Sequence, residues 1–171
     1  MNPNVLSATV RRVRQGVLAL SARRARVALP ARYAVELPAN VVARWNWLSP
    51  YDQHHLLAVA EELRRSGAPH TVVLAGVLHD VGKSGGVSLV SRTLVVLLKR
   101  FAPATVDPIR RSVQPRPGMK GIHLLLNHAE VGARTLEAEG VRQEVVWLVR
   151  HHESTSSHPY LRALQEADER N

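Results

Sequence analysis

Apolar residues return every three or four positions along almost the whole of this chain, which is the period of one face of an α-helix. Glycines and prolines separate the periodic segments and mark their ends. From this pattern we predict an all-α fold without internal repeats. The predicted helices cover residues 5–22, 40–48, 51–66, 71–81, 88–101, 128–139, 141–152 and 158–169.

Residues at the helix ends sharpen several of these boundaries. Gly82 follows the apolar segment 71–81 and is expected to be its C-terminal cap. Asn127, with Glu130 three residues later, is a variant of the capping box, so we expect a helix to begin there. Residues 102–121 carry four of the ten prolines and are expected to be mostly irregular.

The first part of the chain differs from the rest. Residues 5–22 are predicted to form a basic amphipathic helix, whereas "VALPARYAVELPA" (27–39) combines prolines with alternation and indicates a linker or a short extended piece. We therefore predict a helix and linker at 1–39, packed on a helical domain at 40–171. A length of 171 residues suits one domain with a real core.

A histidine and an aspartate that are neighbours in sequence interrupt the apolar run Thr71–Val81. The segment is apolar nearly all round, which predicts burial, yet it contains His79 and Asp80. A buried carboxylate without a partner costs several kcal/mol or takes up a proton. Asp80 therefore needs a partner, and a metal ion, an arginine or a helix N-terminus would each serve.

Other histidines and aspartates also fall on predicted inward faces. His55 shares the stripe of Leu56 and Val59, whereas His54 lies on a wetter face. Each such residue alone is explained by a hydrogen bond in the core, but one shared metal centre would satisfy all of them together. The others are His128, His152 and Asp168. His128 lies at the start of its helix, and His152 continues the line of Val145 and Val149, whereas His151 lies nearer Glu144 and Trp147. Asp168 falls where the pattern of Leu161 and Leu164 calls for another leucine.

Composition limits the ligands and the partners. There is no cysteine, so a metal must be held by His, Asp, Glu or water. The formal charge is +9, with arginines concentrated in "RRVRQ" (11–15) and "ARRAR" (22–26). We interpret these as a solvated N-terminal face; binding of nucleic acid, acidic lipid or a phosphorylated substrate is the alternative. No apolar stretch reaches transmembrane length and no signal-peptide layout is evident, so we expect a cytoplasmic protein.

Five segments, taken in order, resemble the HD superfamily of metal-dependent phosphohydrolases. They are "HLLAVA" (55–60), "VLHDVGK" (77–83), "HAEVGA" (128–133), "VRHHE" (149–153) and "ALQEAD" (163–168). The resemblance implies a helical bundle with a metal site between its helices, and an HD domain over residues 40–171. By analogy, four residues match the signature metal ligands and further histidines match a second metal position bridged by Asp80. The four are His55, His79, Asp80 and Asp168, and the further ones are His128 with His151, His152 or both.

The same resemblance implies an activity. The expected reaction is hydrolysis of a phosphate mono- or diester, with a nucleotide as the expected substrate, by water that one or two ions of Mn, Fe, Co, Ni or Zn activate. Asp80 and Lys83 are the expected catalytic residues, and Lys83 and Arg92 are candidates to bind phosphate oxygens. The Gly-Tyr-Pro signature of cyclic-dinucleotide-cleaving members is replaced by "HHESTSSHPY", which argues against a cyclic di-GMP enzyme.

Two other classes of function stay open at this point. The chain could be a non-catalytic HD module that binds a nucleotide or a protein partner through the same pocket. It could instead bind RNA through its basic N-terminal segment, although three Trp, three Tyr and one Phe offer few rings for stacking on bases.

Overall fold

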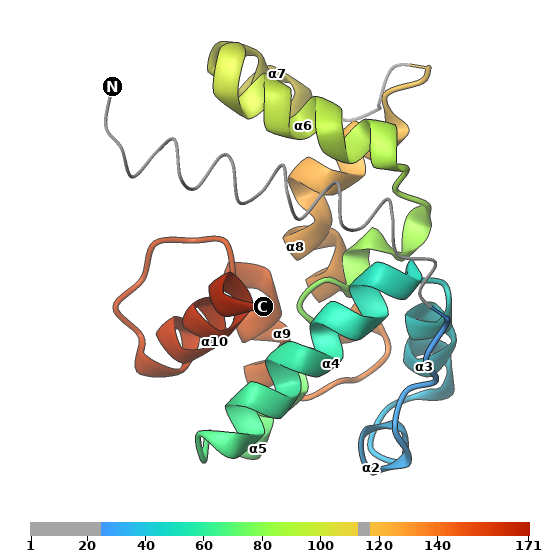
Figure 1. Cartoon of the computed structure of the whole chain (residues 1–171), viewed down its shortest axis with the longest axis vertical. Helices are drawn as coiled ribbons and strands as arrows, with labels where there is room; N and C mark the ends of the chain where they lie inside the picture. Colours follow the sequence, from blue (N-terminus) through green and yellow to red (C-terminus); the bar gives the residue numbers. More distant parts are fainter. Residues whose placement is uncertain (1–24, 113–116) are drawn as a thin grey trace.

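The computed structural model describes residues 25–112 and 117–171, and within these ranges every regular element is helical (Figure 1). The predicted all-α class is therefore confirmed, while the predicted helix over 5–22 lies outside the described residues. The elements are α2 (Ala31–Ala34), α3 (Ala39–Asn46), α4 (Pro50–Arg65), α5 (His70–Leu78), η1 (Val81–Gly85), α6 (Leu89–Phe101), η2 (Pro103–Thr105), α7 (Val106–Arg111), α8 (Lys120–Ala138), α9 (Gln143–His151) and α10 (Pro159–Arg170), where η denotes a 3₁₀-helix.

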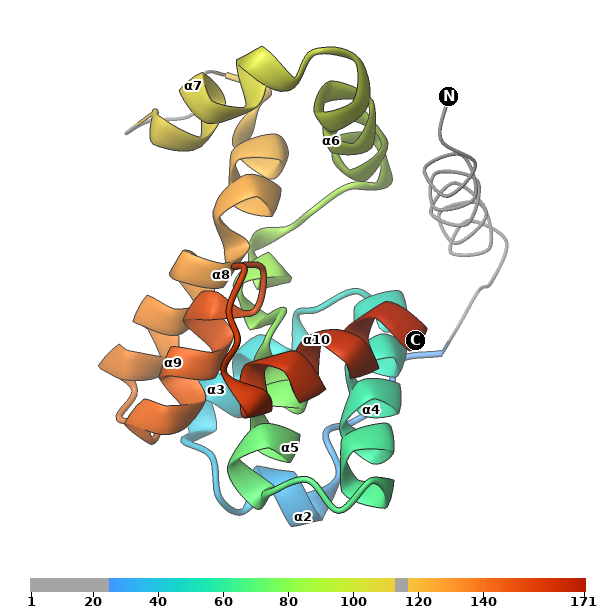
Figure 2. The ribbon, with the colours of Figure 1, turned by 90° about the vertical axis from the view of Figure 1, so that its left-hand side faces the viewer.

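Helix α5 forms the centre of the main core. All residues from Val72 to Leu78 are buried, as a helix that is apolar all round requires. It packs against α4, α9 and α10, which surround it in the lower part of Figure 2. Trp45 from α3 and Leu136 from α8 belong to the same core.

A smaller apolar cluster attaches α6 and α7 to the first half of α8. Val95 of α6 is buried there together with Ile122, Leu125 and Leu126 of α8. Figures 1 and 2 both show α6 and α7 beyond one end of the bundle. We call residues 87–126, which contain α6, α7 and the beginning of α8, the α6–α7 cap. The described residues contain no single helix that is long and apolar enough to cross a membrane, although His70–Gly85 and Val90–Phe101 reach that length and composition together across a bend of 103°.

Two predicted boundaries were wrong. Helix α8 begins at Lys120 rather than near Asn127, because Ile122, Leu125 and Leu126 continue the apolar period toward the N-terminus and pack against the cap. The Asn127 side chain lies inside the helix and donates to the His123 carbonyl at 2.9 Å instead of capping. Residues 102–121, predicted to be mostly irregular, contain η2, α7 and the start of α8.

The prediction for Gly82 was also wrong. Helix α5 ends at Leu78, and Gly82 lies inside η1 rather than at a C-terminal cap. A Cβ atom added to Gly82 would lie 2.1 Å from the His128 carbonyl oxygen, so glycine is needed for the close packing of η1 on α8. In the predicted linker 27–39, Pro30 is followed by the short helix α2, whose Tyr33 is buried in the core.

Candidate metal centre

His79 and Asp80 lie at the junction between α5 and η1. The α-helical hydrogen bonding stops after Leu78, and Asp80 adopts φ −101° and ψ 8° as the chain tightens into the 3₁₀ turn. Both side chains are almost fully buried, with exposed fractions of 1% for His79 and 4% for Asp80. The polar pair is thus fixed at the end of the most buried helix of the bundle.

One side of Asp80 faces a first group of possible metal ligands. Nitrogen or oxygen atoms of His55, His79 and Asp80 all lie within 4.8 Å of one another. The Asp168 carboxylate of α10 closes this group, because its Oδ1 atom lies 2.8 Å from His55 Nε2 and 3.2 Å from His79 Nε2. Helices α4, α5 and α10 therefore contribute to a single cluster.

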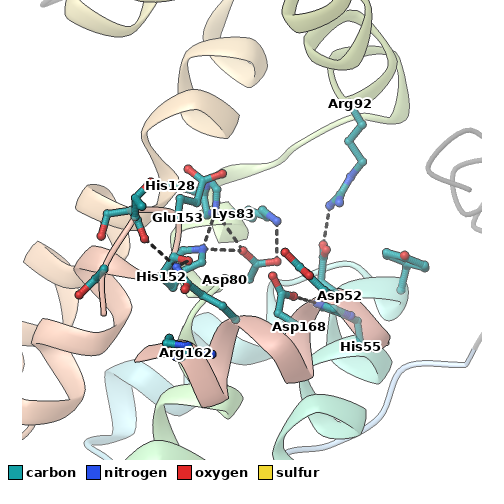
Figure 3. Close-up of a pocket in the computed structure, with 16 residues that line it drawn as sticks. Asp52, His55, Asp80, Lys83, Arg92, His128, His152, Glu153, Arg162 and Asp168 are labelled. Carbon is teal, nitrogen blue, oxygen red and sulfur yellow. Dashed lines mark hydrogen bonds and ion pairs between the residues drawn. The ribbon is translucent and has the colours of Figure 1, made fainter. Parts of the chain in front are cut away.

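The other side of Asp80 faces a second group, which it forms with His128 of α8 and His152 at the end of α9. Asp80 Oδ1 lies 3.1 Å from His128 Nε2 and 3.9 Å from His152 Nε2. The two Nε2 atoms are 3.1 Å apart. Asp80 is the only residue common to both groups, and Figure 3 shows it between the His128–His152 pair and the Asp168–His55 pair.

The backbone fixes the orientation of three of these imidazoles. The Nδ1 atoms of His79, His128 and His152 donate to the carbonyl oxygens of Gly76, Leu125 and Val149, at 3.0, 2.7 and 2.7 Å. This arrangement leaves the Nε2 lone pairs facing the centre of the cluster, as metal-binding histidines require. His79 Nε2 is buried without a hydrogen-bond partner in the described residues, which a metal ion would satisfy. The donor set therefore fits a divalent cation.

Charge interactions in the cluster keep the carboxylates ionised. Burial would raise the pKa of Asp80, but Lys83, His79 and His128 outweigh it and hold that pKa well below its usual range. Burial also opposes ionisation of Asp168, whose pKa is nevertheless lowered by the hydrogen bond with His55 and by the charge of His79 close to its Oδ1 atom. Burial, together with the charge of His79, lowers the pKa of His152 to about 4, so this imidazole is neutral near pH 7.

These features define a class of protein: an all-α bundle whose helices hold a buried cluster of histidines and carboxylates able to bind metal. The family model for the HD domain matches residues 53–170, about two thirds of the chain, and the chain belongs to that family. The resemblance stated from the five sequence segments is thus confirmed. Searches of curated proteins and of solved structures returned no match.

The structure brings most of the predicted site residues together, but not all of them. His151 lies outside the cluster: its Nδ1 atom donates to the Trp147 carbonyl at 2.8 Å and its ring packs on the Trp147 indole. The residues that do converge are His55, His79, Asp80, His128, His152 and Asp168. The remaining four histidines of the chain bond elsewhere or pack on the surface, namely His54, His70, His123 and His158.

The two predicted phosphate-binding residues both line the cleft over the cluster. Lys83 Nζ bonds to Asp80 Oδ2 at 2.5 Å, and the charges of Asp80 and Asp52 raise the Lys83 pKa although burial opposes this. Arg92 extends from α6 to Asp52 Oδ2, at 2.5 Å (Figure 3). The cleft has a volume of about 720 Å³ and is also lined by Ser154, Thr155, Ser156, Arg162 and Gln165.

Sequence analysis missed Asp52. This carboxylate is 2% exposed and accepts hydrogen bonds from Ser49 Oγ at 2.6 Å and from Arg92. "SPYD" (49–52) fits a capping box, and Ser49 does cap α4, so this pattern could have marked the residue as a helix-start carboxylate. Its position on the cleft depends on the packing of α6 over α4, which local sequence does not encode.

Proposed function

We propose that this chain is a metal-dependent phosphohydrolase that cleaves a phosphate ester of a nucleotide. The observation that carries the proposal is the position of Asp80, which is shared by two groups of possible metal ligands. In this proposal His55, His79, Asp80 and Asp168 hold one ion, and Asp80, His128 and His152 hold a second. Nitrogen and carboxylate donors without thiolates favour Mn, Fe, Co, Ni or Zn.

Such ions would supply an activated water molecule and a positive field for the phosphoryl oxygens. The side chains of the protein would hold the ions and contact the substrate. Asp80 would bridge the metal positions, and its low pKa keeps it available as an anionic ligand. Lys83, whose raised pKa keeps it cationic near neutral pH, would donate to a phosphate oxygen beside Asp80.

Cationic and hydroxyl groups stand beside the carboxylates of the cleft and would contact an anionic substrate. Arg92 and Arg162 enter the cleft from α6 and α10, and the Ser154–Ser156 segment adds three hydroxyl groups. A volume of about 720 Å³ lies within the usual range for small-molecule sites. A nucleotide would place its phosphate at the cluster, with its remaining part against the hydroxyl-rich segment and Arg162.

The test is metal analysis of the purified protein, followed by turnover of p-nitrophenyl phosphate, bis-p-nitrophenyl phosphate and a nucleotide panel with added Mn²⁺. We expect metal in the wild-type protein and turnover that a chelator abolishes. Val35→Ser is a matched control, because Val35 is exposed and does not line the cleft. Bound metal and tight nucleotide binding without turnover would instead establish the non-catalytic module.

A further inference from the structure

Helix α6 carries an apolar stripe that faces outward. Val90, Leu94, Leu97 and Phe101 follow one another at spacings of four, three and four residues, which places them on one face of the helix. Their exposed fractions are 67%, 41%, 45% and 76%. A continuous stripe of exposed leucine, valine and phenylalanine side chains differs from the isolated apolar residues of an ordinary surface and indicates a contact with another phase or molecule.

The opposite face of α6 is held by the rest of the protein. Val95 is buried in the smaller core, Arg92 bonds to Asp52 of α4, and Lys99 pairs with Glu153 beside the cleft at 3.9 Å. Arg92 and Lys99 lie about 180–200° around the helix from Val90 at the usual 100° per residue. The helix therefore cannot turn to bury its stripe without breaking these contacts.

Charge is distributed unevenly between the cap and the bundle. The α6–α7 cap, residues 87–126, contains seven Lys and Arg residues but only one acidic residue, Asp107. Residues 25–86 and 127–171 together contain 11 basic and 13 acidic residues. The cap is thus strongly cationic while the bundle that holds the candidate metal centre is slightly anionic. Arg100, Arg110 and Arg111 are exposed in the same part of the molecule as the stripe.

This charge decides between the possible occupants of the stripe. A second copy docked cap to cap would bring two cationic surfaces together, and residues 1–24 carry five arginines and no acidic residue, so either occupant would meet like charge. A nucleic acid would satisfy the charge but would leave the apolar stripe largely exposed to water. An anionic bilayer surface satisfies both, because acyl chains accept the stripe and headgroups attract the flanking cations.

We propose that the outer face of α6 is a docking surface for anionic membranes. The helix would lie in the plane of the interface, with Leu94 and Leu97 at the centre of the buried stripe and Arg100 at the headgroups. Arg92 projects from the opposite face, so docking leaves the cleft pointing away from the acyl chains. The inference rests on the charge and exposure of the cap and does not depend on the proposed hydrolase activity.

The experiment is co-sedimentation of the full chain with phosphatidylcholine vesicles that contain or lack phosphatidylglycerol. We expect binding to the anionic vesicles only, weakening as NaCl screens the attraction. The double variant Leu94→Gln, Leu97→Gln should bind about tenfold more weakly or worse, because two apolar anchors are lost. Val35→Ser, Trp47→Ser is the matched control, since these residues are 80% and 75% exposed but lie outside the cap, and it should bind as the wild type does.

Three outcomes would overturn the proposal. If the Leu94/Leu97 variant, shown by its circular-dichroism melt to be folded, keeps full vesicle binding, another segment makes the contact. If vesicles are not bound and the wild type is a dimer that the variant converts to a monomer, the stripe is an interface between copies. If single-stranded RNA binds and anionic vesicles do not, the cap is a nucleic-acid-binding surface. None of these readouts uses turnover, so failure here is distinguishable from failure of the proposed function.

Discussion

His128 and His152 direct their Nε2 atoms at each other across 3.1 Å, while the Nδ1 atom of each ring donates to a carbonyl oxygen of the backbone three residues earlier. Two neutral rings in this tautomer would set lone pair against lone pair. A bound cation would remove that conflict, and Asp80 Oδ1, 3.1 Å from His128 Nε2, would help the two imidazoles to hold it. This pair is the reason to expect a second metal position.

Asp80 should be indispensable for both positions. Asp80→Asn keeps the shape of the side chain but removes the charge that both ligand groups share. We expect the metal content measured by elemental analysis to fall at least to half, and Mn²⁺-dependent turnover to fall by about 10³-fold or more. A variant with full metal content and full turnover would refute the assignment of the site.

The histidine doublet gives a matched pair of variants. His152 is buried beside Asp80, whereas the His151 ring packs on Trp147 outside the cluster. We expect His152→Ala to weaken metal binding by 10-fold or more, on the order of the loss of one ligand, and His151→Ala to leave it within about twofold. Isothermal titration of the metal-free variants with Mn²⁺ measures both, and the reverse order would exclude His152 from the ligand set.

Gly82 should tolerate no side chain. In Gly82→Ala the new Cβ atom would meet the His128 carbonyl oxygen at 2.1 Å and the Gly132 nitrogen at 2.8 Å, so η1 must move away from α8. We expect the free energy of unfolding in urea to fall by about 3 kcal/mol. Gly85→Ala is the control, because its nearest neighbour is the flexible Leu124 side chain at 2.9 Å, and it should cost less than about 1 kcal/mol.

Removal of metal should destabilise the fold. Without an ion the buried Asp80 carboxylate and the partly exposed Asp168 carboxylate are only incompletely compensated by the neighbouring imidazoles. A ligand at a thousandfold excess over its Kd adds about 4 kcal/mol, and for a domain of this size a chelator should lower Tm by about 10 °C. Added Mn²⁺ should restore it. Asp168→Asn should shrink the metal-dependent increment, whereas a melting curve indifferent to chelator and metal would show that hydrogen bonds alone satisfy the cluster.

The stability that His79 and His152 contribute to the chelated protein should be greatest near pH 6.5. The pKa of His152 is lowered to about 4, so below pH 6.5 the unfolded chain binds more protons than the native one and stability falls toward pH 4. The pKa of His79 is raised above 6.5 by Asp80 and Asp168 in spite of burial, so its contribution is lost as pH rises through that folded value. Urea unfolding at a series of pH values measures both the acid and the alkaline loss of stability. Saturating Mn²⁺ should remove the alkaline loss, because a metal-bound imidazole is neutral, and His152→Gln should reduce the acid loss.

The sequence by itself determined the all-α class, the burial of α5 and the recurrence of inward histidines and aspartates. Helical periodicity is a local property, and an apolar helix with one carboxylate requires a partner wherever it is packed. It also favoured His55 over His54 and His152 over His151, since a register error of one residue turns a side chain by about 100°.

Only the tertiary structure decided the contacts between distant segments. The start of α8 at Lys120 depends on its packing against the cap, and the role of Gly82 depends on the approach of η1 to the His128 carbonyl. Arg92 and Asp52 are 40 residues apart, and nothing local relates a cation in one helix to the capping carboxylate of another. Such pairings follow from how the helices stack around α5, because the free energy that sets them comes from burial of the whole core rather than from any one segment.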